Sequence, residues 1–173
     1  MLKNATRTAC AALLLAAAGC TYSVKSPSLD LPAGSRVAVG SVINNSETAL
    51  AADKVRALLA ARVRLDFGED SPVYQPSSSD DVLPRQDAEA ARSWAVSQGA
   101  NYILCATVEE WRYKSGLDGE PAVGLTLELQ EAATGRSVWS ASGAKTGWGR
   151  SSLSATGGKL LDKLLSGLEA AKR

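Results

Sequence analysis

The stretch PAVGLTLELQEAATGRSVWSASGA, residues 121–144, determines the fold of this chain. Its first half alternates apolar residues at the odd positions 123–129 with small or polar residues at the even positions. This period of two is typical of a β-strand with one buried and one solvated face. Thr134-Gly135 then predicts a short turn, and residues 137–144 form the next strand. The stretch therefore predicts two antiparallel strands.

A third strand precedes this pair. Tyr102–Val108 is apolar at both odd and even positions, as expected for a strand covered on two faces, and polar residues follow at Glu109 and Glu110. Because neighbouring residues of a strand point to opposite faces, we expect these two glutamates to point apart, which excludes them as an acid/base pair on one site. The three strands together predict an antiparallel meander.

The flanking sequence supplies the remaining elements. Residues 36–42 are β-branched and alternating, which predicts a strand; turn and cap residues at 44–46 then lead into a helix that extends to Leu65. Residues 73–74 form at best a short strand, and a second helix is expected from an N-cap at Asp87 to Gly99. A last helix has leucines at helical spacing from 153 to 168, and its Gly157 and Gly158 suggest close backbone packing.

The expected order of elements is β-α-(β)-α-β-β-β-α. We therefore predict an α/β fold (an α+β sandwich) with a mixed sheet, a three-strand antiparallel meander and about three helices. The length of 173 residues suits one small domain, and no internal repeat is visible.

The N-terminus predicts a lipoprotein signal peptide at residues 1–19. Lys3 and Arg7 precede a short apolar run, Ala9–Ala18, which is too short to span a bilayer. Cys20 follows small residues and resembles the lipobox of bacterial lipoproteins, although Ala17 stands where that pattern prefers Leu. We expect Cys20 to carry a diacylglycerol and a fatty acyl chain, and by the usual sorting rule the next residue, Thr, favours the outer membrane. The alternative is an ordinary cleaved signal peptide with an incidental cysteine.

Residues 20–33 are interpreted as the acylated cysteine and a flexible tether, because the segment is rich in Ser and Pro and has no useful periodicity. Fully extended, such a tether reaches at most roughly 45 Å. Residues 34–173 are interpreted as a single periplasmic α/β domain.

The formal net charge of +1 conceals blocks of opposite sign. Residues 66–131 hold thirteen acidic side chains against four basic ones, whereas residues 132–173 hold seven basic against two acidic. If folding keeps these blocks on different faces, each face can attract its own partner. The near-neutral total argues against a general nucleic-acid binder.

Several kinds of chemistry are excluded by the composition. The chain has no His, which removes Ser-His-Asp and Cys-His catalysis and any zinc site that contains histidine. Cys105 lies in an apolar strand and is expected to be an inert core thiol. Gly147-Trp148-Gly149 lacks the spacing and the Lys of a nucleotide loop. We expect no enzyme activity, no metal, no nucleic acid, and no cofactor besides the acyl chains on Cys20.

The tryptophans are unusually frequent, four against one Phe. Trp94 and Trp139 are expected to be packed, and Trp111 could be packed or exposed. Trp148 lies between two glycines and is bracketed by Lys145 and Arg150, a set that favours a lipid headgroup interface. The alternative for Trp148 is a core residue that caps the last helix.

Four stretches resemble the PelC family, the outer-membrane lipoproteins of Pel exopolysaccharide export. They are VEEWRYK at 108–114, GLDGEPAVG at 116–124, WSASGA at 139–144 and Gly147-Trp148. The Gly-Leu-Asp-Gly-Glu-Pro loop is the most specific of them, because it is not a generic turn. The resemblance is dense from Tyr102 to Leu168 and agrees with the lipobox.

The resemblance implies a non-enzymatic subunit that assembles into a lipid-anchored ring, a dodecamer, on the periplasmic leaflet of the outer membrane. The ring would lie beneath the β-barrel porin PelB and guide a cationic amino-sugar polymer towards it during formation of the biofilm matrix. It implies that Cys20 is the anchor, Asp118 faces the polymer and Trp148 contacts the membrane. The charge pattern adds Glu120 to the acidic surface, and Lys145 and Arg150 beside the lipid. The alternative function is a monomeric periplasmic lipoprotein adaptor that activates or scaffolds an envelope enzyme.

Overall fold

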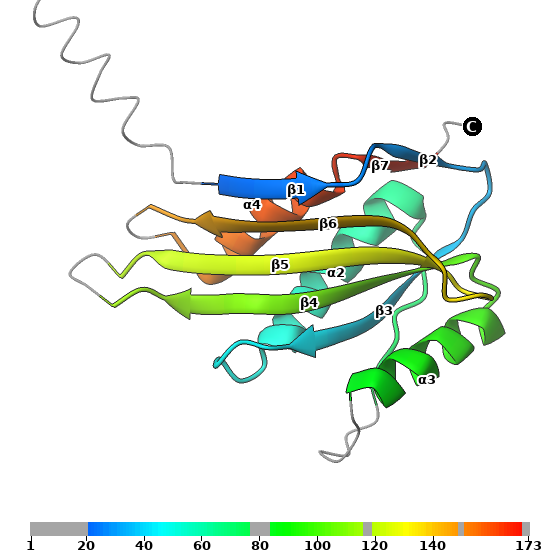
Figure 1. Ribbon diagram of the computed structural model, residues 1–173, viewed down its shortest axis with the longest axis horizontal. Coiled ribbons are helices and arrows are strands. Elements are labelled where there is room, and N and C mark those ends of the chain that lie inside the picture. The colour runs from blue at the N-terminus through cyan, green and yellow to red at the C-terminus, as the bar shows by residue number, and fades with distance from the viewer. Residues whose placement is uncertain (1–20, 77–83, 116–118, 149–150, 171–173) are drawn as a thin grey trace, which may run out of the picture.

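The computed structural model describes residues 21–76, 84–115, 119–148 and 151–170. Within these residues, seven strands and three helices form a five-stranded sheet of order β1-β6-β5-β4-β3, a two-stranded sheet β2-β7, and helices α2 to α4 (Figure 1). In chain order the elements are β1 (Thr21–Lys25), β2 (Leu29–Leu31), β3 (Val37–Asn44), α2 (Ala51–Phe67), α3 (Pro84–Ser97), β4 (Tyr102–Tyr113), β5 (Pro121–Glu131), β6 (Ser137–Thr146), α4 (Leu153–Leu165) and β7 (Leu168–Ala170).

The predicted meander is confirmed, because β4, β5 and β6 pair antiparallel in sequence order. The odd residues of β5, at positions 123–129, are all buried, as their alternation predicted. Strand β3 joins the other edge of β4 in parallel, through a crossover that contains α2 and α3. The fold class is therefore the predicted α+β arrangement with a mixed sheet.

Helices α2 and α4 cover one face of the sheet, and α3 lies against β3 on the other face (Figure 1). Trp111 and Trp139 are buried in the main core, so the packed alternative holds for Trp111. Trp94 is partly buried in a second, smaller core under α3, with its ring centroid 5.5 Å from that of Tyr74. No described helix covers the second face over β1, β6 and β5, which we call the outer sheet face.

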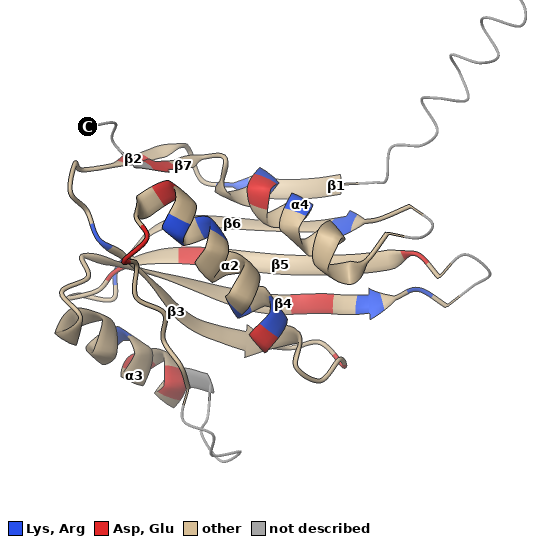
Figure 2. Cartoon of the chain, turned by 180° about the vertical axis from the view of Figure 1, so that it is seen from behind, with Lys and Arg blue, Asp and Glu red and all other residues tan. Residues whose placement is uncertain are grey.

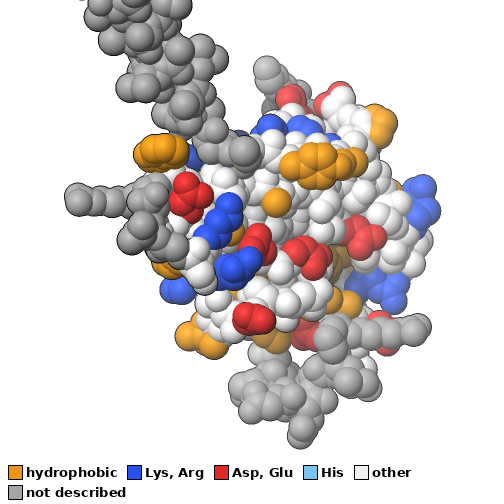
Figure 3. Space-filling model, turned by 60° about the vertical axis from the view of Figure 1, so that its left-hand side comes forward, with side chains coloured by type: hydrophobic (Ala, Val, Ile, Leu, Met, Phe, Trp, Pro, Cys, Tyr) orange, Lys and Arg blue, Asp and Glu red, His pale blue; other side chains and the backbone are white. Residues whose placement is uncertain are grey.

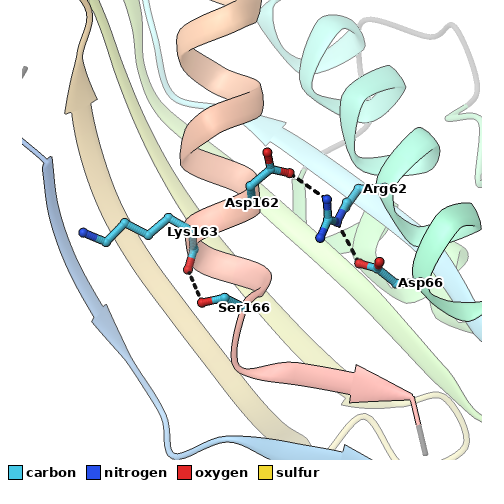
Figure 4. A network of polar contacts seen from close by, with 5 residues as sticks. All are labelled: Arg62, Asp66, Asp162, Lys163 and Ser166. Carbon is cyan, nitrogen blue, oxygen red and sulfur yellow. Dashed lines mark hydrogen bonds and ion pairs between the residues drawn. The ribbon is translucent and has the colours of Figure 1, made fainter. Parts of the chain in front are cut away.

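A shared arginine links the two helices that cover the sheet. Arg62 of α2 binds Asp66 one turn further on, at 2.8 Å, and Asp162 of α4, at 3.0 Å (Figure 4). All three side chains are partly exposed, so the two ion pairs contribute only about 0–1 kcal/mol each. They join α2 to α4 at the surface, whereas the buried residues of the main core hold the two helices against the sheet.

The prediction of a flexible tether between Thr21 and Ala33 is wrong. Thr21–Lys25 pairs antiparallel with β6, and Leu29–Leu31 pairs in parallel with β7. Leu31 is buried in the main core, and the Lys25 ammonium donates to the Lys163 carbonyl. Strand β1 escaped the sequence patterns because it is a five-residue edge strand, held mainly by backbone hydrogen bonds. The folded domain therefore begins at Thr21 and not at residue 34.

Other boundaries differ in smaller ways. Asp87 is not an N-cap: α3 begins at Pro84, and the Asp87 carboxylate accepts a hydrogen bond from the Tyr74 hydroxyl. The short strand at residues 73–74 is a single bridge between Val39 and Val73. Helix α4 ends at Leu165, so Leu168 belongs to β7. Each difference arises from a tertiary contact that local sequence cannot show.

The two neighbouring glycines of α4 provide a matched test of core packing. A Cβ on Gly157 would lie 2.7 Å from the buried Trp111 ring, whereas a Cβ on Gly158 would meet nothing within 4 Å. Gly157→Ala should lower the free energy of unfolding by about 1–3 kcal/mol through overpacking. Gly158→Ala should raise it by up to about 1 kcal/mol, because alanine favours the helix. Urea unfolding of the two variants checks the pair, and equal effects of the same sign would contradict the packing of Gly157 on Trp111.

Candidate functional site

One end of the sheet brings together the predicted site residues that the structure describes, which are Glu120, Lys145 and Trp148. We call it the Thr21 end, because β1 starts there; the β4–β5 and β6–α4 connections lie at the same end (Figure 1). Thr21 is paired with Lys145 near the end of β6. Cys20 lies outside the described residues, but it precedes Thr21 by one peptide bond, so the two Cα atoms are about 3.8 Å apart.

Trp148 projects from this end with 63% of its surface exposed, so the alternative of a core tryptophan is wrong. The backbone on both sides is fixed: the Gly147 N–H donates to the Pro121 carbonyl at 2.8 Å, and the Ser151 hydroxyl donates to the Trp148 carbonyl at 2.9 Å. A Cβ on Gly147 would lie 2.5 Å from the Pro121 ring, so no larger residue fits there. These contacts of Gly147 and of the Trp148 carbonyl hold a large aromatic side chain in solvent.

Two further exposed aromatic residues lie at the Thr21 end, and the sequence analysis missed both. Tyr22 is 70% exposed and is paired with Ala144, while Tyr113 is 52% exposed and is paired with Pro121. Tyr22 lies two residues after the predicted anchor at Cys20. This closeness to the anchor could have identified it as a candidate membrane contact. Tyr113 had no such signal, because only the pairing of β4 with β5 brings it near Trp148.

Basic side chains surround Trp148. Lys145 donates to the Thr21 hydroxyl at 2.8 Å, and a surface cavity of about 250 Å³ is lined by Lys145, Trp148 and Lys159 among others. Lys159 comes from α4 and was not predicted. Arg150, the other predicted base, lies outside the described residues. An exposed indole thus lies next to two cations, one at the end of β6 and one on α4.

Of the predicted acidic residues, Asp118 lies outside the described residues and Glu120 lies at the Thr21 end. The Glu120 carboxylate is 3.8 Å from the Lys114 ammonium, and both side chains are partly exposed. The adjacent backbone closes the hairpin, with the Lys114 N–H donating to the Glu120 carbonyl at 2.8 Å. Glu120 and Trp148 therefore occupy neighbouring connections, and Lys114 offsets part of the Glu120 charge.

The expectation that Glu109 and Glu110 point to opposite faces is wrong. The register of β4 and β5 shifts between Val108 and Glu110, so two residues of β4 lie opposite Gly124. A Cβ on Gly124 would lie 3.4 Å from the Cβ of Glu109 and 3.3 Å from that of Glu110, which places both on the outer sheet face. Strict alternation fails at such a bulge.

The paired glutamates line a surface cavity of about 470 Å³ together with Glu47 and Arg112. The Glu109 carboxylate accepts hydrogen bonds from Asn45 and Thr126, and Glu110 is 2.9 Å from Arg112. Three carboxylates against one guanidinium give the cavity a negative charge, so it attracts cationic groups.

The charge blocks of the sequence do not form separate faces at the Thr21 end. Glu120 and Glu110 from the acidic block lie close to Lys145 from the basic block, because β4, β5 and β6 are neighbours; Glu110 and Lys145 line one cavity of about 210 Å³. Figure 2 marks acidic and basic positions next to one another along the same helices and strands, and Figure 3 shows acidic and basic side chains intermixed on the face that it draws. Separate acidic and basic faces were expected only if each charge block of the sequence folded onto its own face. The meander instead places strands of the acidic block next to a strand of the basic block.

Cys105 has the surroundings of a structural thiol. It is packed against the smaller core, and burial raises the pKa of its thiol to about 11. In the described ranges, no cluster of three potential metal-ligating side chains is present. No helix in the described part of the chain is long and apolar enough to cross a membrane.

Comparisons with known proteins identify the family. No protein-family model and no curated protein matches the chain. Among solved structures, the PelC dodecamer from Paraburkholderia phytofirmans is 38% identical over 87% of this chain and 99% of that chain, with a TM-score of 0.73. The chain belongs to the PelC family. A single-substitution variant of the same PelC dodecamer, in another crystal form, is 39% identical over the same shares of the two chains, with a TM-score of 0.74.

A more distant structure shares the fold alone. The lipoprotein GNA1162 from Neisseria meningitidis is 17% identical, with a TM-score of 0.53, over 76% of this chain and 95% of that chain. The PelC fold is thus also found in a lipoprotein with little sequence similarity to this chain.

The raised pKa of Cys105 predicts a slow reaction with iodoacetamide. In a Cys20→Ser form without residues 1–19, Cys105 is the sole thiol. Because its pKa is raised to about 11, almost all of the thiol is protonated at pH 8 in the folded state. At pH 8 its alkylation should be at least about a hundredfold slower in the folded protein than in urea, where the ordinary pKa of about 8.5 returns. Equal rates in both states, followed by mass spectrometry, would contradict this environment.

Proposed function

We propose that this PelC-family chain is a lipid-anchored, ring-forming subunit of a Pel-type exopolysaccharide export apparatus. Acylated Cys20 would hold it on the periplasmic leaflet of the outer membrane. The ring would guide a cationic amino-sugar polymer to a PelB-like β-barrel porin, for the biofilm matrix. No step in this function needs catalysis.

The observation that carries the proposal is the clustering of exposed aromatic residues beside the predicted anchor. Tyr22, Tyr113 and Trp148 all lie at the Thr21 end, next to the position of Cys20. Tyr and Trp favour the membrane interface, because the ring leaves water while the polar group stays hydrated. Lys145 and Lys159 add cations that attract anionic headgroups, and Arg150 is proposed to do the same.

The docking of β1 supports a specific orientation. Since Thr21 is already part of the sheet, no slack chain separates the acylated residue from the folded domain. The Thr21 end would therefore lie against the lipid, with the strands directed away from it. A single acyl chain binds a membrane only marginally, whereas several chains with interfacial side chains bind firmly.

The polymer contact is assigned to Asp118 and Glu120 in the β4–β5 connection. Because this connection adjoins the Trp148 loop, the acidic side chains would act close to the membrane, near the mouth of the porin. Exposed ion pairs contribute about 0–1 kcal/mol each and are screened over about 8 Å in physiological salt. Many such weak contacts, repeated around a ring, can guide a polycation without trapping it.

Assembly is inferred from the relatives, whose solved forms are dodecamers. A ring of the same size would repeat the anchor, the aromatic residues and the acidic side chains in each subunit. The second candidate, a monomeric adaptor for an envelope enzyme, uses the same anchor without assembly. The mass of the detergent-solubilised protein separates the two, because an adaptor should remain a monomer.

The membrane contact is tested with a soluble Cys20→Ser form and liposomes that contain anionic lipid. Trp148→Ala, alone or with Tyr22→Ala, should lower the partition coefficient several-fold, because each side chain buries apolar area in the interface. Val96→Ala is a matched control, since Val96 is also an exposed apolar residue but lies on α3. Co-sedimentation measures the effect. Equal partitioning of the soluble Cys20→Ser form and of every variant would contradict a membrane contact at the Thr21 end.

The polymer contact is tested by secretion of the polysaccharide. Asp118→Asn with Glu120→Gln should reduce secreted polymer several-fold while assembly and anchoring persist, because the substitutions remove charge and keep size. Glu69→Gln with Asp70→Asn removes two exposed acids from the loop after α2, at the other end of the sheet, and should have little effect. Normal secretion by the Asp118/Glu120 variant would contradict the assignment.

A further inference from the structure

Helix α2 has an apolar stripe on the side that faces away from its own core. Its buried residues, such as Val55, Leu59 and Val63, face the sheet. The opposite side carries exposed Ala57, Ala61 and Leu65 at helical spacing, and Leu65 is 80% exposed. A row of exposed apolar side chains on a helix is a surface on which a partner can pack.

Leu50 extends this stripe beyond the start of the helix. It is 67% exposed and has a φ of +61°, the left-handed region that a bulky residue rarely adopts. A left-handed backbone costs such a residue about 1–2 kcal/mol. Because the Leu50 side chain is exposed, its packing within this chain does not offset that cost. Strain of this kind points to a contact that the isolated subunit does not make.

The second unpaired surface is the outer sheet face. Its centre over β5 and β6 consists of small or hydroxylated side chains, including Thr126, Ser140, Ser142 and Ala144. Exposed Tyr22 and Val24 border it on β1. Because these side chains are short, a helix can approach the strands closely, as α2 and α4 do on the other face.

The two surfaces lie on opposite sides of the molecule, with the sheet between them (Figures 1 and 2). Both run alongside the strands from the Thr21 end to the far end. Copies stacked front to back would therefore keep every Thr21 end on the same side. This is the arrangement that a ring on one membrane needs, and front-to-back contacts give a ring when the rotation from each copy to the next closes.

We propose that the α2 stripe of one subunit packs on the outer sheet face of the next copy of this chain, and that this contact builds the ring. The proposal rests on the ring assembly of the proposed function and names the two surfaces that make it. The stripe consists of Leu50, Ala57, Ala61 and Leu65, and the opposing surface is centred on Ser142.

Charge complementarity supports this pairing and its register. Lys54 and Arg64 flank the stripe, and neither side chain makes an ion pair with a described residue. Lys54 lies towards the Thr21 end of α2, where the outer sheet face carries Glu109 and Glu110. Arg64 lies towards the far end, as does Glu128 on β5. If the Thr21 ends of two neighbours lie at the same height, Lys54 of one copy faces the paired glutamates of the next, and Arg64 faces Glu128.

Disulfide cross-linking tests the contact in the full acylated chain in detergent. Ala61→Cys and Ser142→Cys together should give a ladder of covalent multimers on oxidation. Each single variant should remain uncrosslinked, because neither position meets its own copy. A ladder from Ala61→Cys alone would mean that two α2 stripes face each other, and it would overturn the proposal.

A charge introduced into the stripe provides the second test. Leu65→Glu should reduce the assembled protein to a monomer by light scattering, while its thermal unfolding stays within a few degrees because the residue is exposed. Val96→Glu, on an exposed apolar position outside both surfaces, should leave assembly unchanged.

The outcomes separate this inference from the proposed function. An assembled wild type with an assembled Leu65→Glu variant, or no ladder from the double cysteine variant, overturns the interface and leaves the ring. A monomeric wild type contradicts the ring itself. Loss of assembly in Leu65→Glu but not in Val96→Glu, together with the ladder, supports the interface.

Discussion

The backbone pairing of β1 with β6 is the constraint on which the orientation of this molecule depends. Thr21–Lys25 is hydrogen-bonded along Ala141–Lys145, so the domain is joined to the predicted anchor by a single peptide bond. Lys25 reinforces the pairing by donating to the Lys163 carbonyl and the Ser166 hydroxyl of α4. Without this strand, about ten residues would separate anchor and domain, and the domain could tumble.

Once β1 is fixed, the rest of the Thr21 end follows from the meander. The same strand order that brings Lys145 beside Thr21 brings the Trp148 loop beside Pro121, and Tyr113 beside them. The position next to the predicted anchor, the exposed aromatic side chains and the cations thus share one end, because three consecutive strands pair in sequence order. When the Thr21 end faces the lipid, the α2 stripe and the outer sheet face lie on the sides of the molecule. In this position both surfaces can contact neighbouring copies.

Much of the fold was predictable because β5 alternates strictly, β4 begins with a continuous apolar run and the helices carry apolar residues at helical spacing. The odd residues 123–129 of β5 could only be one buried face. Strands β1 and β2 were not predictable, since edge strands need no apolar pattern of their own. The bulge that places Glu109 and Glu110 together was not predictable either, because it depends on register against Gly124.

The candidate site divides in the same way. The residues around Trp148 suggested a membrane contact, but only the structure decides that the indole is exposed, with the Gly147 N–H bound to Pro121 and the Trp148 carbonyl bound to Ser151. Lys159 and Tyr113 join the site through α4 and β4, which no local spacing reveals. Separate charged faces were an attractive expectation from the charge blocks, and the meander interleaves those blocks instead.

The most direct test of the account is the depth of the two ends of β6 relative to the lipid. Spin labels at Thr146 and Ser137, in the acylated protein on liposomes, mark opposite ends of a strand about 30 Å long. If the Thr21 end lies against the lipid, the label at Thr146 should lie at the headgroups, where oxygen in the lipid phase relaxes it and an aqueous paramagnetic agent does not reach it. The label at Ser137 should remain in water. Equal aqueous accessibility of the two labels would contradict this orientation.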